Sequence, residues 1–138
     1  MSTSTQLAQN AYMLPHLFSA TRVKLDQVRV EHKNLLISDR MMRNKLEHIS
    51  SAFKQLSMSE LPIPDAMATL LITQITKTSQ YARDMAEQEQ RIVAESHQRA
   101  AGNEESEAGE YFVISDQLDH CASDLRWNLT HKDQPKPV

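Results

Sequence analysis

Apolar residues recur at alternating steps of three and four along residues 20–58, and no Gly or Pro interrupts them. That spacing places a stripe along one side of a helix, so it predicts one long helix packed lengthwise against another. Two positions of the stripe, His32 and Asp39, are polar. The stripe consists of Leu25, Val28, His32, Leu35, Asp39, Met42, Leu46, Ile49, Phe53 and Leu56.

Two further helices are predicted downstream. A loop with two prolines ends the first helix, and Asp65 is a suitable N-cap for a second helix over residues 66–101. The acidic segment 102–109 begins and ends with glycine, so it is predicted to be a flexible linker. A third helix is predicted over residues 110–131, with one apolar face.

The pattern predicts an all-α fold with one helical domain over residues 20–131. The helices over 20–58 and 66–101 are expected to form a long antiparallel, coiled-coil-like hairpin, because only a short loop joins them. The shorter C-terminal helix would complete an oligomeric helical bundle. Residues 1–19 are an apolar, partly flexible N-terminal segment, and residues 132–138 are expected to be a disordered tail.

The two polar stripe positions are predicted to set the register of this hairpin. Folding the second helix back on the first brings His32 near Glu89 and Asp39 near Arg83. Buried polar pairs of this kind fix the alignment of two helices at some cost in stability.

A second apolar stripe lies on the opposite side of the first helix. A helix in a lone hairpin would carry polar residues there, so this stripe predicts another packing partner. The partner is either the third helix or a second subunit, and we favour a homodimer or higher oligomer. The predicted interface residues are Val23, Val30, Leu36, Ile37 and Met41.

Charge is divided unevenly along the chain, whose net charge is −3. Residues 20–57 hold eight basic and four acidic side chains, whereas residues 58–138 hold seven basic and fourteen acidic ones. The basic helix is expected to pack beside acidic helices, or to present a face to an acidic partner or nucleic acid. That face would consist of Arg22, Lys24, Arg29, Lys33, Arg40, Arg43 and Lys45.

The sequence gives little support for catalysis or metal binding. Cys121 is the only cysteine, and Asp116, His120 and Cys121 are fewer than the four ligands of a structural zinc site. We therefore predict no catalytic residue, no cofactor and no metal. The single cysteine, the absence of a signal-peptide pattern and the lack of a long apolar run favour a cytoplasmic protein without a membrane span.

These observations favour a non-enzymatic assembly or adaptor protein that binds another protein and self-associates. The alternative is a small nucleic-acid-associated regulator that uses the basic half of the first helix. A third, weaker hypothesis is a chaperone that masks a helix of one partner.

Overall fold

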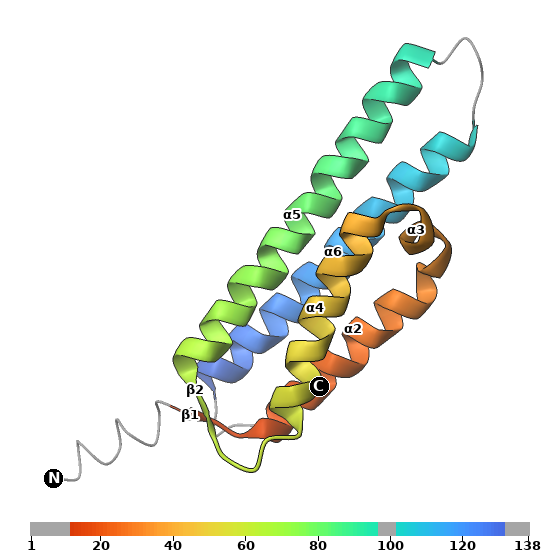
Figure 1. Cartoon of the computed structure of the whole chain (residues 1–138). Coiled ribbons are helices and arrows are strands. Elements are labelled where there is room, and N and C mark those ends of the chain that lie inside the picture. The colour runs from red at the N-terminus through yellow and green to blue at the C-terminus, as the bar shows by residue number, and fades with distance from the viewer. Residues whose placement is uncertain (1–11, 97–101, 132–138) are drawn as a thin grey trace, which may run out of the picture.

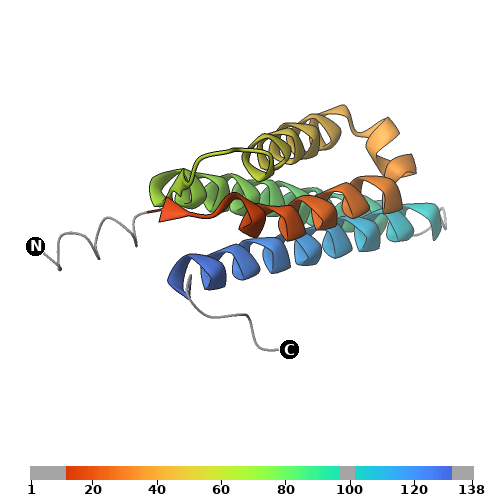
Figure 2. The same ribbon diagram turned by 90° about the horizontal axis from the view of Figure 1, so that it is seen from below.

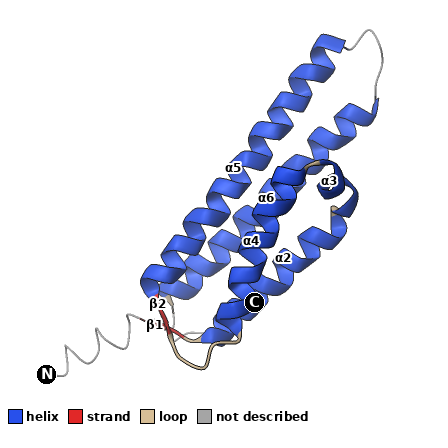
Figure 3. Ribbon diagram, in the orientation of Figure 1, coloured by secondary structure: helices blue, strands red, loops and turns tan. Residues whose placement is uncertain are grey.

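The computed structural model describes residues 12–96 and 102–131, and these are mostly helical, as predicted (Figures 1 and 3). The two strands are only two residues long each. In chain order the elements are β1 (Tyr12–Met13), the 3-10 helix η1 (Pro15–Phe18), α2 (Ser19–Glu31), α3 (Lys33–Ser38), α4 (Arg40–Ser57), β2 (Ile63–Pro64), α5 (Asp65–Ser96) and α6 (Gly102–Thr130).

The predicted single helix over residues 20–58 is wrong, because the chain turns twice within it. The turns fall at His32 and Asp39, the two polar positions of the apolar stripe. Asp39 has an extended backbone, with ψ of 90°, and its Oδ1 accepts a hydrogen bond of 3.0 Å from the amide of Met42. Asp39 therefore acts as the N-cap of α4.

These turns fold α4 back against α2, and the four long helices form an antiparallel bundle (Figures 1 and 2). α2 packs between α4 and α6, while α5 packs between α4 and α6 on the other side. α3 forms the elbow between α2 and α4. The stripe residues of both helices still face a common core, although the two helices now run in opposite directions.

The predicted packing of the helix over 20–58 on the helix over 66–101 is confirmed only in part, because α4 packs against α5. Asp39 accepts a hydrogen bond from Tyr81, which is two residues from its predicted neighbour Arg83. The long antiparallel hairpin, however, consists of α5 and α6, with 32 and 29 residues. The short length of α2 and α4 explains the difference, because neither can cover the whole of α5.

The predicted linker over residues 102–109 is also wrong, because α6 begins at Gly102. Alanine and glutamate are good helix formers, and glutamates near a helix N-terminus interact favourably with its dipole. The connection from α5 to α6 therefore falls on residues 97–101, which lie outside the described residues, as do 1–11 and the predicted tail over 132–138.

The described part of the N-terminal segment packs on its own chain. β1 pairs antiparallel with β2 in the proline loop, with Met13 opposite Ile63. The Phe18 ring lies 5.8 Å from that of Phe53, centroid to centroid, and both side chains are fully buried. Residues 12–18 thus close the end of the bundle at which α4 is followed by α5.

The core combines side chains from all four long helices. The predicted apolar positions of the third helix are buried as expected, and so are most members of the first stripe. Buried residues include Leu25, Val28, Met42, Leu46, Ile49, Phe53, Leu71, Ile75, Tyr111, Ile114, Leu118 and Leu125.

The capping role of Asp39 gives a stability prediction. Asp39→Ala should lower the free energy of unfolding by about 2–4 kcal/mol, because it removes a helix cap and the acceptor for two tyrosine hydroxyls. Asp39→Asn keeps an acceptor at the cap and should cost less than half as much. Urea denaturation followed by circular dichroism measures both, and equal losses would contradict this account.

Candidate functional site

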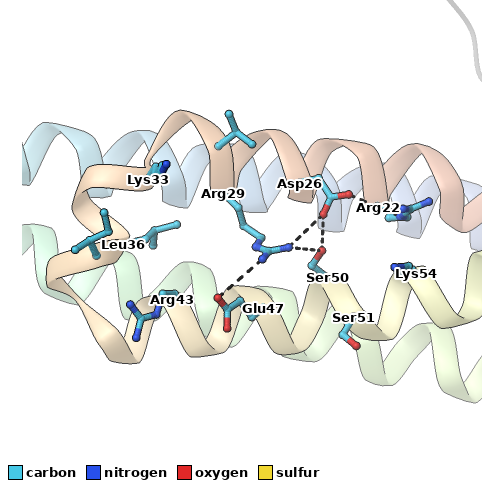
Figure 4. Close-up of a pocket in the computed structure, with 12 residues that line it drawn as sticks. Arg22, Asp26, Arg29, Lys33, Leu36, Arg43, Glu47, Ser50, Ser51 and Lys54 are labelled. Atoms are coloured by element: carbon cyan, nitrogen blue, oxygen red, sulfur yellow. Dashed lines mark hydrogen bonds and ion pairs between the residues drawn. The ribbon is translucent and has the colours of Figure 1, made fainter.

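A groove lies between α2 and α4 on the outside of the bundle, with a volume of about 900 Å³ (Figure 4). Its two walls are antiparallel helices joined by the α3 elbow. Its lining residues are Arg22, Asp26, Arg29, Val30, Lys33, Leu36, Ile37, Arg43, Glu47, Ser50, Ser51 and Lys54.

Arg29 spans the middle of the groove from α2 to α4 (Figure 4). Its guanidinium donates to the Ser50 hydroxyl at 3.4 Å and lies 3.5 Å from Asp26 and 3.9 Å from Glu47. Ser50 in turn donates to Asp26 at 2.6 Å. The Arg29 charge is therefore matched by two carboxylates, and the network links the two walls.

Cations remain at both ends of the groove. Lys33 and Arg43 lie at the end next to the elbow, and Arg22 and Lys54 lie at the other end (Figure 4). Arg22 is 3.7 Å from Asp26, whereas Lys33, Arg43 and Lys54 have no ion pair within residues 12–96 and 102–131. With five basic and two acidic side chains, the lining is positively charged.

Apolar side chains share this surface. Val30 is 75% exposed and Ile37 is 62% exposed, although both are aliphatic. Val23 and Met41 are exposed as well, so four of the five predicted interface residues face solvent. Leu36 is the exception: it is 4% exposed, because the turn of α3 directs it into the core beside Leu35.

The seven predicted basic residues do not form one continuous face. Arg22, Arg29, Lys33 and Arg43 line the groove, and Arg40 is exposed at the start of α4. Lys24 instead forms an ion pair with Asp124 of α6, and the Lys45 ammonium lies 5.3 Å from the centroid of the Tyr81 ring. Sequence reasoning missed Lys54 and Glu47 as groove residues, because it placed α2 and α4 on one straight helix.

The predicted register pairs are not the pairs that the structure forms. The His32 ring nitrogens lie 2.9 Å from Glu110 Oε2 and 2.9 Å from Gln117 Oε1, so α6 occupies both of them.

Asp39 and Arg83 also contact α6. Asp39 accepts from the hydroxyls of Tyr81 and Tyr111, and Arg83 bonds to Ser115 and Asp119. The register prediction failed because it assigned these polar groups to an interface of two helices, whereas a third helix supplies partners for both.

The environment of Asp39 changes the acidity of both tyrosines. Burial, followed by the adjacent Asp39 carboxylate, raises the pKa of Tyr81 from 10.0 to about 12. Burial and the hydrogen bond to Asp39 raise the pKa of Tyr111 as well. Both hydroxyls therefore remain hydrogen-bond donors above pH 10, where an ordinary tyrosine ionises, and their bonds to Asp39 keep the elbow attached to α5 and α6.

Cys121 is a buried thiol whose pKa is raised to about 11, chiefly by burial; Lys24 acts in the opposite direction and Asp124 adds to the rise. Asp116 and His120, the two residues considered with it as zinc ligands, are exposed. A protonated, inaccessible thiol of this kind is a packing residue and not a nucleophile.

The described residues show neither a metal site nor a membrane span. Over 12–96 and 102–131, no cluster of three or more His, Cys, Asp or Glu side chains is placed to hold a metal ion. Within the same residues, each helix is too short or too polar to cross a bilayer.

The chain matches no protein-family model, no curated protein and no solved structure.

The raised pKa of Tyr81 leads to a prediction about alkaline pH. The folded state favours the protonated phenol, so this contribution to stability is complete below pH 10 and is lost as the pH rises towards about 12. The difference in phenolate absorbance between wild type and Tyr81→Phe should show Tyr81 ionising near pH 12. In Asp39→Asn it should ionise at lower pH, and an unchanged midpoint would mean that the carboxylate has no influence.

Proposed function

We propose that this chain is a non-enzymatic helical adaptor that acts through protein–protein interaction and self-association, using the outer face of α2, α3 and α4. The supporting observation is that one groove combines exposed aliphatic side chains with cations that form no ion pair among the described residues. Val30 and Ile37 lie in the same lining as Lys33 and Arg43. Apolar groups surrounded by charged ones are typical of a surface that another protein covers.

The energetics are consistent with self-association. Burying an aliphatic side chain contributes about 1.5–3 kcal/mol, so Val30, Ile37 and Met41 together contribute about 4–9 kcal/mol on one subunit. A two-fold axis doubles this contribution, because each subunit then presents the same surface. The total is comparable to or larger than the cost of association, which is estimated at about 4–15 kcal/mol.

The polar residues of the groove and elbow support a structural role over a catalytic one. Asp39 caps a helix, Arg29 links two helices, and His32 holds α6. Each of these titratable groups is engaged in packing the bundle, so none is left poised beside a nucleophile.

Nucleic-acid binding is the second candidate, and it is favoured by Lys33, Arg43 and Lys54, which have no ion pair in the part of the chain that the structure describes. Two features of the lining favour a protein partner instead. Asp26 and Glu47 would repel phosphates, and none of the twelve lining residues is aromatic, so the groove offers no surface on which bases stack. Binding of mixed oligonucleotides over a salt series separates the two candidates. A steep loss of affinity with salt would support nucleic acid, and no binding at low salt would remove it.

Ile37 provides the test of self-association. We expect light scattering to give a dimer or larger mass for the wild-type chain at micromolar concentrations. Ile37→Asp should yield a monomer with unchanged helicity, because Ile37 is 62% exposed and lies outside the core.

The matched control is Leu61→Asp, which places the same charge on an exposed aliphatic residue in the loop before α5. It should leave the mass unchanged. A monomeric wild-type chain would contradict the proposed self-association.

A further inference from the structure

The α5–α6 pair is longer than the α2–α4 pair, and it extends past the elbow (Figure 1). Asp39 marks the level of the elbow, because it accepts hydrogen bonds from Tyr81 of α5 and Tyr111 of α6. We call the part beyond it the stem, which consists of residues 86–96 of α5 and 102–109 of α6. The molecule is therefore a thick bundle with a thinner extension, and a step separates the two.

The stem continues the face that α5 and α6 turn towards the core of the bundle. Ile92 follows the column of buried apolar positions along α5 and is 37% exposed. Glu95 is one turn further along α5, and Glu107 is one turn before the buried Tyr111 on α6. Both glutamates are exposed. Beyond the elbow, this face is no longer apolar: it carries the acidic side chains Glu95 and Glu107, together with the aliphatic Ile92.

The charge of this region is opposite to that of the groove. Residues 86–96 and 102–109 of the stem hold six acidic side chains and one basic one, whereas the groove lining holds five basic and two acidic ones. Each surface also offers aliphatic contact, through Ile92 on the stem and through Val30 and Ile37 in the groove.

The two features also have similar lengths. The groove follows α4 from Arg43 to Lys54, which is about 17 Å at 1.5 Å per residue, and residues 86–96 of the stem span about 15 Å. A second copy that packs against the step with its helices antiparallel to those of the first would place its stem along this groove. The same two-fold operation would bring the first stem along the second groove, which closes the assembly at two subunits.

We propose that the groove between α2 and α4 of one copy receives the acidic α5–α6 stem of a second copy, in a reciprocal two-fold dimer. The proposal rests on the self-association argued above and names the surface that the groove binds. Lys33 and Arg43 face the acidic side chains of the stem, and Val30 and Ile37 contact its aliphatic residues.

This arrangement fixes the sign of the salt dependence. Attraction between opposite charges is screened by salt, so the dimer should dissociate more readily as NaCl rises from low to high concentration. A dimer made by two basic groove faces packed on each other would become tighter with salt. Sedimentation of the wild-type chain over a salt series distinguishes the two arrangements. A dimer whose affinity increases with salt would overturn this proposal, but it would still support self-association.

Charge reversal provides the direct test. A groove variant, Lys33→Glu with Arg43→Glu, and a stem variant, Glu95→Lys with Glu107→Lys, should each bind themselves at least about tenfold more weakly than wild type. An equimolar mixture should recover a heterodimer, because each groove then meets a stem of opposite charge. All four residues lie outside the core, and circular dichroism verifies that the variants keep their helicity.

The control reverses two exposed cations elsewhere on α5 and α6, Lys77→Glu with Arg126→Glu, with the same change in net charge. It should dimerise like wild type and should not associate preferentially with the stem variant. Self-dissociated variants that fail to recover a heterodimer would overturn the stem as the partner of the groove. A monomeric wild-type chain would instead overturn the self-association on which the proposal rests.

Discussion

The fold depends on the Asp39 carboxylate. It caps α4 through the Met42 amide, and it accepts the hydroxyls of Tyr81 and Tyr111 from two other helices. A half-buried carboxylate needs several donors to offset its lost hydration, and no single helix of this bundle provides them all. Three helices meet at this side chain. Asp39 therefore fixes the turn between α3 and α4, and it also fixes how far along α5 and α6 the shorter helices α2 and α4 extend.

Much of the core was predictable from the sequence, because apolar spacing reports which side of a helix is buried. Leu25, Met42 and Leu46 are buried as expected, and α4 packs against α5. The turns were not predictable in the same way. A polar residue within an apolar stripe can be a paired residue of a straight helix or a cap at a corner, and the spacing is the same in both cases.

The groove could not be predicted for the same reason, because it exists only when the chain turns at Asp39. On a straight helix, Arg29 and Glu47 would lie far apart, and no groove would exist between residues 20 and 58. Once Asp39 turns the chain, side chains that are distant in sequence become opposite walls, and Lys54 joins Arg22 at one end. The exposed stripe itself was visible in the sequence at Val23, Val30 and Ile37, because it depends only on local helical spacing.

The order in which the helices pack has a consequence for how the chain folds. α2 with α4, α4 with α5, and α5 with α6 are neighbours in sequence, so these contacts form with short loops. Contacts that are local in sequence favour rapid folding, because little chain entropy is lost in closing each loop. The contact of α2 with α6 joins the two ends of the chain, and Lys24, Glu31 and His32 supply its polar partners. We therefore expect the interactions of these three residues to form late in folding, after the contacts between helices that are neighbours in sequence.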